Sequence, residues 1–178
     1  MAAKPTLALI VAMAENGVIG RAGEVPWRLA THLKRLTELT ARKPVIFGRR
    51  TFDARPRPLP RRPNIVLTRS PKYAYQGGWV VASMDEAMDF VGRLAEEWGA
   101  EEAFVLGGAE TFRSALDRVQ RIHLSCVHAA VAGDATFPEL DPAEWREVSR
   151  ERFARNPWDE HDHSYIVLER IVRYEKHS

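Results

Sequence analysis

VIFGRRT, at residues 45–51, is the stretch that decides the fold expected for this chain. Three apolar residues form a short strand, and Gly48 follows at the point where that strand ends. Arg49, Arg50 and Thr51 then supply two guanidinium groups and a hydroxyl, which suit the oxygens of a phosphate. The pattern indicates a phosphate-binding turn at the end of a strand. A basic surface turn is the alternative interpretation of this segment alone.

Strand-like and helix-like segments alternate on both sides of this run. Thr6 to Ala14 is a continuous apolar run, as expected for a strand covered on both faces. Helical spacing of apolar residues starts near Leu29, and Pro44 blocks its continuation. Further strands are predicted at residues 64–68, 79–82, 103–106 and 121–127, helices at 84–98 and 110–116, and an antiparallel pair at 148–153 and 164–174.

This order of elements predicts one α/β domain over residues 1–178. Its centre is a doubly wound, mainly parallel sheet with a C-terminal antiparallel hairpin. The helix near residue 84 has a clear start signal, because Ser83 and Glu86 have the spacing of a capping box. Its end is predicted at Gly99.

Composition excludes several classes of protein. The chain has 178 residues, of which 45% are hydrophobic and 28% charged, as in an ordinary globular domain. A net charge of +2 and a pI of about 8.8 are too weakly basic to indicate nucleic-acid binding. The single cysteine, Cys126, excludes an intrachain disulfide and is expected to be a buried, inert thiol. We expect no bound metal, no membrane association, a cytoplasmic location, and a monomer or homodimer.

Two further segments carry chemistry. Residues 104–110, FVLGGAE, deliver Gly107 and Gly108 from a strand to a helix start, where glycines let a ligand approach the backbone. A tight strand-to-helix turn is the alternative. Arg69 follows the strand at 64–68 and is expected at the same sheet edge as Arg49 and Arg50, since parallel strands end on one side. No glycine-rich turn follows the first strand, so the pattern is not a Rossmann fingerprint.

Seven segments in order resemble the dihydrofolate reductase family. They are residues 9–12, 17–20, 25–27, 43–52, 57–66, 105–108 and 133–138. Together they cover nearly the whole chain. The resemblance implies NADPH-dependent reduction of a 7,8-dihydropterin to the tetrahydro form, with dihydrofolate as the first choice of substrate.

The resemblance also implies a cofactor site for NADPH. Thr68 and Arg69 would meet the 2′-phosphate, and a cis peptide would join Gly107 to Gly108. Residues 17–27 correspond to a loop that closes over the nicotinamide, with Asp134 hydrogen-bonded to the closed form. The implied cofactor residues are Ala12, Ile19, Gly20, Gly48, Arg49, Arg50, Thr51, Thr68, Arg69, Gly107, Gly108, Ala109, Glu110, Thr111 and Phe112.

On the substrate side, the resemblance implies a pterin pocket. Arg62 corresponds to the arginine that binds the carboxylate of the glutamate tail. The implied substrate residues are Ile10, Val11, Leu33, Leu36, Arg55, Leu59 and Arg62. The implied catalytic residues are Trp27, His32 and Ser125, the last as the hydroxyl that supports the catalytic acid.

The sequence departs from the family at that acid. Counting five residues from Trp27 gives His32, and no Asp or Glu occurs between Trp27 and Arg35. A carboxylate accepts two hydrogen bonds from a pterin, whereas a neutral imidazole accepts one. With an ordinary pKa of about 6.5, His32 could still relay a proton; the alternative is that it faces solvent. We expect Arg28, Arg35 and Arg55 to make the rim of the pocket cationic.

Three other functions remain open on the sequence. One is reduction of another dihydropterin, such as dihydromethanopterin, whose phosphate would use the cationic rim. Another is the related reductase of riboflavin synthesis, against which the Pro26-Trp27 loop argues. The third is a non-catalytic protein that kept the NADPH site and lost the acid.

Overall fold

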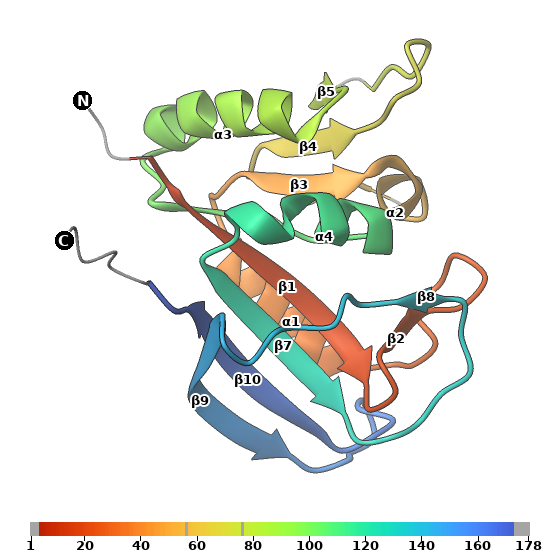
Figure 1. Cartoon of the computed structure of the whole chain (residues 1–178). Coiled ribbons are helices and arrows are strands. Elements are labelled where there is room, and N and C mark those ends of the chain that lie inside the picture. The colour runs from red at the N-terminus through yellow and green to blue at the C-terminus, as the bar shows by residue number, and fades with distance from the viewer. Residues whose placement is uncertain (1–3, 56, 76, 173–178) are drawn as a thin grey trace, which may run out of the picture.

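The computed structural model describes residues 4–55, 57–75 and 77–172. An eight-stranded sheet with the order β5-β4-β3-β6-β1-β7-β10-β9 runs through it (Figure 1). Its parallel strands are β1 (Thr6–Ala14), β3 (Val45–Gly48), β4 (Asn64–Leu67), β5 (Trp79–Val81), β6 (Glu102–Val105) and β7 (Arg121–Val127). β9 (Trp145–Phe153) and β10 (His163–Arg170) complete one edge as an antiparallel pair. The predicted fold class is confirmed, although the predicted last strand extends to residue 174, and residues 173 and 174 lie outside the described residues.

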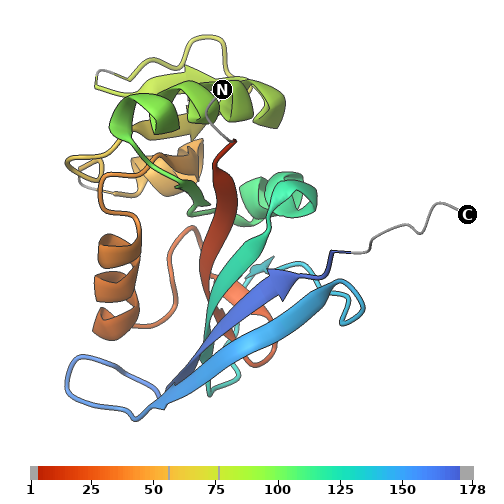
Figure 2. The ribbon, with the colours of Figure 1, turned by 90° about the vertical axis from the view of Figure 1, so that its left-hand side faces the viewer.

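Helices cover both faces of the sheet. In Figure 1, α3 (Met84–Trp98) and α4 (Ala109–Ala115) lie in front of the sheet, and α1 (Ala30–Leu39) lies behind it. Figure 2 shows α1 and α4 on opposite sides of β1. A fourth helix, α2 (Arg49–Asp53), begins where β3 ends, and a short 3-10 turn, η1 (Leu116–Arg118), follows α4. The apolar core is therefore divided into two clusters, one on each face of the sheet. Leu9 of β1 belongs to the cluster beside α3 and α4, and Ile10 belongs to the cluster beside α1.

Ser83 and Glu86 cap the start of α3 as predicted, although the Glu86 carboxylate binds one residue before the N-cap. The Ser83 hydroxyl accepts a hydrogen bond from the Glu86 backbone N–H at 3.1 Å. The Glu86 carboxylate in turn accepts from the backbone N–H of Ala82 at 2.8 Å. Gly99 ends the helix with a φ of 65°, a left-handed conformation that glycine adopts without steric cost.

The start of α1 is capped by a residue distant in the sequence. None of its own side chains caps it. Instead, the carboxylate of Asp159, in the loop between β9 and β10, accepts from the backbone N–H of Thr31 at 2.9 Å and also from the Thr31 hydroxyl. The amide of Asn156 donates to the same carboxylate at 2.9 Å. Asp159 is fully buried, so this loop fixes where α1 begins.

A second, two-stranded ribbon was not predicted from the sequence. β2 (Val18–Gly20) pairs antiparallel with β8 (Ala135–Thr136) beside the main sheet (Figure 1). These strands have three and two residues, too few for an alternating pattern to be recognised. The ribbon holds the loop of residues 17–27 against the segment that contains Asp134.

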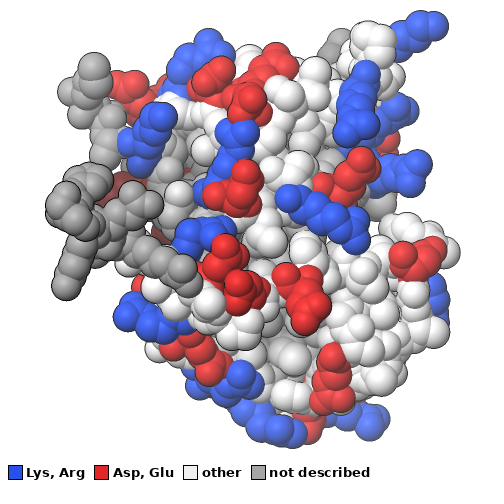
Figure 3. Space-filling model, viewed as in Figure 1, with Lys and Arg blue, Asp and Glu red and all other residues white. Residues whose placement is uncertain are grey.

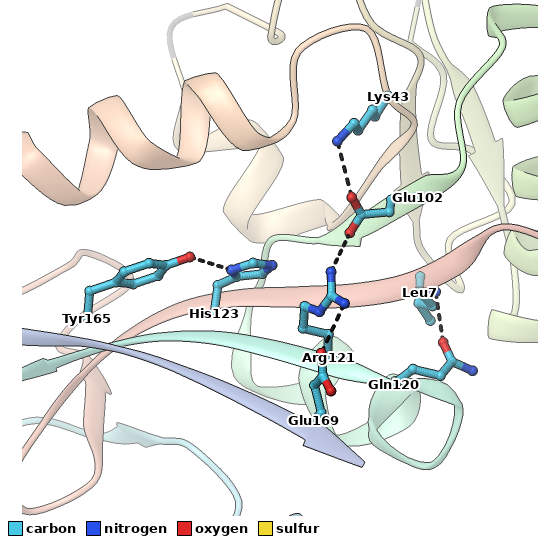
Figure 4. Close-up of polar contacts among 8 residues, drawn as sticks. All are labelled: Leu7, Lys43, Glu102, Gln120, Arg121, His123, Tyr165 and Glu169. Atoms are coloured by element: carbon cyan, nitrogen blue, oxygen red, sulfur yellow. Dashed lines mark hydrogen bonds and ion pairs between the residues drawn. The ribbon is translucent and has the colours of Figure 1, made fainter. Parts of the chain in front are cut away.

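Charged side chains join the strand ends on the side opposite the glycine turns. Glu102 binds Lys43 at 3.3 Å and Arg121 at 3.6 Å, and Arg121 also binds Glu169 at 3.0 Å (Figure 4). Acidic and basic residues are likewise interspersed over the face that carries α3 and α4 (Figure 3). Mixed charge of this kind gives no extended surface of one sign on that face. In the described part of the chain, no helix is long and apolar enough to cross a membrane.

Replacing Asp159 should destabilise the protein markedly. Asp159→Ala leaves the first turn of α1 without its cap and creates buried donors without acceptors, so we expect the free energy of unfolding to fall by about 2–4 kcal/mol. Urea denaturation followed by circular dichroism measures this change. Asp89→Ala, at an exposed position of α3, is the matched control and should change stability by less than about 0.5 kcal/mol. Equal stability of the two variants would contradict the assigned role of Asp159.

Candidate active site

The ends of β3 and β6 meet through backbone atoms. The N–H of Gly48 donates to the carbonyl of Gly107 at 2.6 Å, and the peptide between Gly107 and Gly108 is cis, as the resemblance implied. A methyl group on Gly48 would clash with the Thr111 hydroxyl, and one on Gly108 would lie 2.8 Å from the Thr51 hydroxyl. The starts of α2 and α4 are thereby brought side by side. This glycine contact provides the close backbone approach that a bound dinucleotide needs.

The arginines predicted to bind phosphate are placed at this edge but are not all directed at one point. Arg49 binds Asp53 at 3.3 Å and lies over the ring of Tyr73, whose hydroxyl donates to Asp53 at 2.7 Å. Arg69 approaches Glu110 at 4.0 Å, and both side chains are almost fully exposed. A salt bridge so exposed contributes little to stability and leaves the guanidinium available to a ligand. Convergence of Arg49, Arg50 and Arg69 on one phosphate stays a prediction.

The loop of residues 17–27 is tied to its expected partner. The Asp134 carboxylate accepts from the backbone N–H of Ala22 at 3.2 and 3.3 Å, and the N–H of Asp134 donates to the carbonyl of Gly20 at 3.1 Å. Trp27, at the end of the loop, is buried against Ala14 and neighbouring apolar residues. The described loop therefore has the contacts that the resemblance assigns to a closed form.

Other predicted cofactor residues lie near the glycine contact, with side chains that serve different purposes. Thr111 is buried, and Phe112 packs edge-on against Phe137 with ring centroids 5.5 Å apart. Thr68 accepts a hydrogen bond from the backbone N–H of Ser70 at 3.1 Å, which fixes the turn after β4. Whether Ala12, Ile19, Ala109 and Glu110 contact a cofactor stays a prediction.

The predicted pterin residues divide between the two faces of the sheet. Ile10, Leu36 and Leu59 belong to the buried cluster on the side of α1. Val11 belongs to the cluster on the opposite face, because neighbouring residues of a strand point to opposite sides. Only the backbone of Val11 is therefore on the same side as the Ile10 side chain, and the assignment of Val11 to the pterin pocket stays a prediction. Leu33 has 57% of its surface exposed, so it is open to a ligand.

Two arginines stand at the far end of the same side of the sheet. Arg62 is buried and donates to the Pro60 carbonyl at 3.0 Å, to the Thr37 carbonyl at 3.2 Å and to the Thr40 hydroxyl at 2.5 Å. These bonds use its Nε and Nη1 atoms. Arg55 lies over the ring of Phe47 at 5.3 Å, and its buried Nε has no hydrogen-bond partner. Burial lowers the pKa of both guanidinium groups. Arg55 is thus partly inside the pocket, not only at its rim.

His32 does not face solvent as the alternative interpretation supposed. Its Nδ1 atom lies 2.8 Å from the Ser125 hydroxyl oxygen, at hydrogen-bond distance. Burial, followed by the charge of Arg35 and the proximity of His163, lowers the pKa of His32 from 6.5 to about 4. At neutral pH the ring is therefore uncharged, and a role of His32 as a proton relay stays a prediction.

Arg35 is the residue that the sequence misplaced most. It was expected at the rim of the pocket, but its guanidinium lies under α1, 3.9 Å from the ring centroid of Tyr165 and 5.0 Å from that of Phe153. Its Nη1 donates to the Ser125 hydroxyl oxygen at 3.0 Å. Aromatic faces and one hydroxyl thus hold a half-buried cation next to His32.

Arg28 does remain near the surface. It helps to line a shallow depression of about 260 Å³, together with Arg21, Glu24, Val25, Pro26, Trp27 and Glu160. The backbone N–H of Arg28 donates to Glu160 at 3.0 Å. This depression adjoins the start of α1.

Two buried histidines beneath α1 were missed from the sequence. The Nδ1 atom of His123 lies 2.6 Å from the Tyr165 hydroxyl, and its Nε2 is buried without a partner (Figure 4). Burial lowers the pKa of His123 to about 4. His163 is fully buried, stacks on Phe153 at 5.1 Å, and has no partner for either ring nitrogen. The only signal was their position in strand-like segments, which does not distinguish a buried histidine from an exposed one. In the described residues, no group of acidic, histidine or cysteine side chains could hold a metal ion.

A mainly parallel sheet with a glycine contact at its carboxyl edge, and a buried apolar cluster on the side of α1, is typical of α/β enzymes that bind a dinucleotide at that edge. The sequence model of dihydrofolate reductase matches residues 6–170. The dihydrofolate reductase of Bacillus subtilis is 33% identical over 164 residues, which are 92% of this chain and 94% of that protein. The dihydrofolate reductase of Neisseria gonorrhoeae is 39% identical over 145 residues, 81% of this chain and 86% of that protein.

Solved structures give the same result. The dihydrofolate reductase of Enterococcus faecalis, in complex with NADP(H) and RAB-propyl, superimposes with a TM-score of 0.84 at 31% identity. The match covers 94% of this chain and 97% of that one. The chain belongs to the dihydrofolate reductase family.

The glycine contact can be tested by adding one methyl group. Gly48→Ala places a Cβ against the Thr111 hydroxyl, which must push α4 away from β3. We expect the Kd for NADPH to rise at least about tenfold, as measured by fluorescence titration. In Gly92→Ala, where nothing lies within 4 Å of the added Cβ, the Kd should stay the same. Unchanged NADPH binding by Gly48→Ala would show that the contact is not part of the cofactor site.

The buried histidines should make stability depend on pH. Because the pKa of His123 is about 4 in the folded protein and 6.5 without burial, the unfolded chain binds more protons between those values. Stability therefore rises with pH across that window and is lost on acidification. Between pH 7 and pH 4, we expect unfolding free energy to fall by roughly 3 kcal/mol more in the unmodified protein than in His123→Gln. Urea denaturation at both pH values measures the difference; parallel losses in the two proteins would contradict a neutral, buried His123.

Proposed function

We propose that this chain catalyses the NADPH-dependent reduction of a 7,8-dihydropterin to its tetrahydro form, with dihydrofolate as the first choice of substrate. The observation that carries the proposal is the glycine contact, because it brings the starts of α2 and α4 side by side at the carboxyl edge of the sheet. Membership of the dihydrofolate reductase family over residues 6–170 supports it. So does the NADP(H) complex of the relative from Enterococcus faecalis.

The residues around the glycine contact fit NADPH. Methyl groups at Gly48 and Gly108 would collide with the hydroxyls of Thr111 and Thr51, so only glycine lets the backbone and these two hydroxyls lie this close together. In the proposal, the starts of α2 and α4 hold the pyrophosphate, and the exposed Arg69 meets the 2′-phosphate next to Thr68. When bound, NADPH supplies the hydride that reduces C6 of the pterin.

The cluster under α1 fits the pterin and its tail. Ile10, Leu36 and Leu59 offer an apolar surface to the ring. Arg62 is held through Nε and Nη1, which leaves its Nη2 atom for a carboxylate of the glutamate tail. The chain positions the ring and excludes water around it, with Trp27 and the loop tied to Asp134 on the cofactor side.

The chain supplies no acidic group where the family has one. His32 is neutral at physiological pH because its pKa is about 4. Since its ring carries only one proton and that proton is part of the neutral imidazole, His32 holds none to release. The proton that reaches N5 of the pterin therefore comes from water in this proposal.

Turnover of dihydrofolate tests the proposed function directly. We expect loss of NADPH absorbance when purified protein, NADPH and dihydrofolate are mixed, with a rate that shows no titration near pH 6.5, because His32 is already neutral there. The measurement is repeated at several pH values between 5 and 8. In this range the spontaneous decay of NADPH is small during the assay. His32→Asp should raise kcat/KM for dihydrofolate, since a carboxylate can pair with both pterin donors.

Two outcomes would contradict the choice of substrate. NADPH binding without turnover of dihydrofolate, but with turnover of dihydromethanopterin, would make another dihydropterin the substrate. NADPH binding without turnover of any dihydropterin would identify a non-catalytic member of the family. The cytoplasmic location and the monomeric or homodimeric state that the sequence predicts are part of the proposal, and gel filtration tests the second.

A further inference from the structure

Ser125 is a buried hydroxyl between two nitrogen-bearing side chains. It is 1% exposed on β7. Its oxygen lies 3.0 Å from Arg35 Nη1 and 2.8 Å from His32 Nδ1. Within the described residues, these two side chains are its hydrogen-bond partners. A buried hydroxyl has one hydrogen to donate and needs an acceptor for it.

Arg35 decides the direction of these two hydrogen bonds. A guanidinium group only donates, so the Ser125 oxygen must be the acceptor in the bond with Arg35. The hydroxyl hydrogen then has one acceptor within reach, the Nδ1 atom of His32. Because Nδ1 accepts, the single proton of the neutral imidazole is carried on Nε2.

The position of Arg35 is itself fixed. Its guanidinium is held over the rings of Tyr165 and Phe153, and these rings belong to β10 and β9. The same cation opposes a second proton on His32, in agreement with the lowered pKa of His32. Electrostatics and hydrogen bonding therefore favour the same form of His32, which is neutral and carries its proton on Nε2.

The Nε2 atom of His32 is open to a ligand. Among the described residues, the buried side-chain atoms without a hydrogen-bond partner are Arg55 Nε, His123 Nε2 and both ring nitrogens of His163. His32 Nε2 is not one of them, and it makes no hydrogen bond in the described part of the chain. His32 itself is partly exposed. Its N–H is thus free to bind a ligand at the position that the family uses for its acid.

We propose that Arg35 is a positioning residue that, through Ser125, fixes His32 as a hydrogen-bond donor, so that the site favours a pteridine whose recognition edge carries an acceptor. The inference rests on the proposed function, because it places the pteridine next to His32. A carboxylate binds the ring N–H and amino group of a pterin, which are both donors. An N–H group instead binds a carbonyl, such as that of a 2,4-dioxopteridine.

Dihydrofolate is still a ligand for such a site. Its pterin ring carries acceptors, O4 and N1, on either side of the two donors. One of them can accept the proton on His32 Nε2 after a small shift of the ring. The 2-amino group is then left without a protein acceptor, which lowers affinity relative to a 2-oxo analogue.

Nitrogen NMR tests the form of His32 without any ligand. We expect the spectrum of the ¹⁵N-histidine-labelled full chain at pH 7 to show His32 protonated on Nε2 and unprotonated on Nδ1. Ser125→Ala and Arg35→Met should each populate both neutral forms, whereas Ser125→Thr, which keeps the hydroxyl, should behave as the unmodified chain. Lys34→Met, the neighbouring exposed residue of α1, is the matched control for Arg35→Met. A proton on His32 Nδ1 in the unmodified chain would overturn the proposal.

Binding of two simple pteridines tests the consequence. Lumazine (2,4-dioxopteridine) and pterin (2-amino-4-oxopteridine) differ at the edge in question, and their Kd values are measured by fluorescence with the NADP⁺-loaded full chain. We expect lumazine to bind about tenfold more tightly than pterin, and His32→Asp to reverse this order. Ser125→Ala and Arg35→Met should reduce the preference, while Ser125→Thr and Lys34→Met should keep it. Tighter binding of pterin by the unmodified chain would overturn the proposal.

Failure of this inference and failure of the proposed function give different results. Neither the NMR nor the binding measurement requires turnover. Dihydrofolate turnover together with a preference for pterin would overturn the inference and leave the proposed function standing. Absence of turnover together with a preference for lumazine would leave the inference standing and direct the search for substrate to 2-oxo dihydropteridines.

Discussion

The hydrogen bond between Gly48 and the Gly107 carbonyl joins the two strand ends on which the rest of the site depends. β3 and β6 pair over only Val45–Phe104 and Ile46–Val105, and the glycines continue their approach beyond the sheet. Because neither glycine has a side chain, α2 and α4 can start next to each other. β6 also pairs with β1. The Ile10 side chain of β1 points to the face of the sheet that α1 covers, opposite the face that α3 and α4 cover.

The substrate side depends on a different part of the chain. α1 carries His32, but its start is set by Asp159 and its underside is supported by rings from β9 and β10. The C-terminal hairpin is therefore a structural support of the site and not only the edge of the sheet. A change in the loop that contains Asp159 would shift His32, because the first turn of α1 would lose its fixed position.

The site also departs, at His32, from the acid that the resemblance to the family implies. Where the family has a carboxylate, this chain has a neutral His32 supported by the buried cation of Arg35. Partial burial of a charge is costly, and two aromatic faces and a hydroxyl offset that cost together with the charges of Glu151, Asp159 and Glu38.

The sequence by itself determined the strands of the main sheet, the cap at Ser83, the two glycine turns and the place of His32, because each is a local pattern within a few residues. It could not place Arg35 under α1 or Asp159 at the helix start. Those depend on partners far along the chain, such as Ser125, which lies 93 residues from His32. Only the tertiary structure brings such partners together. The hydrogen bonds to these partners then decide which ring nitrogen of His32 carries the proton.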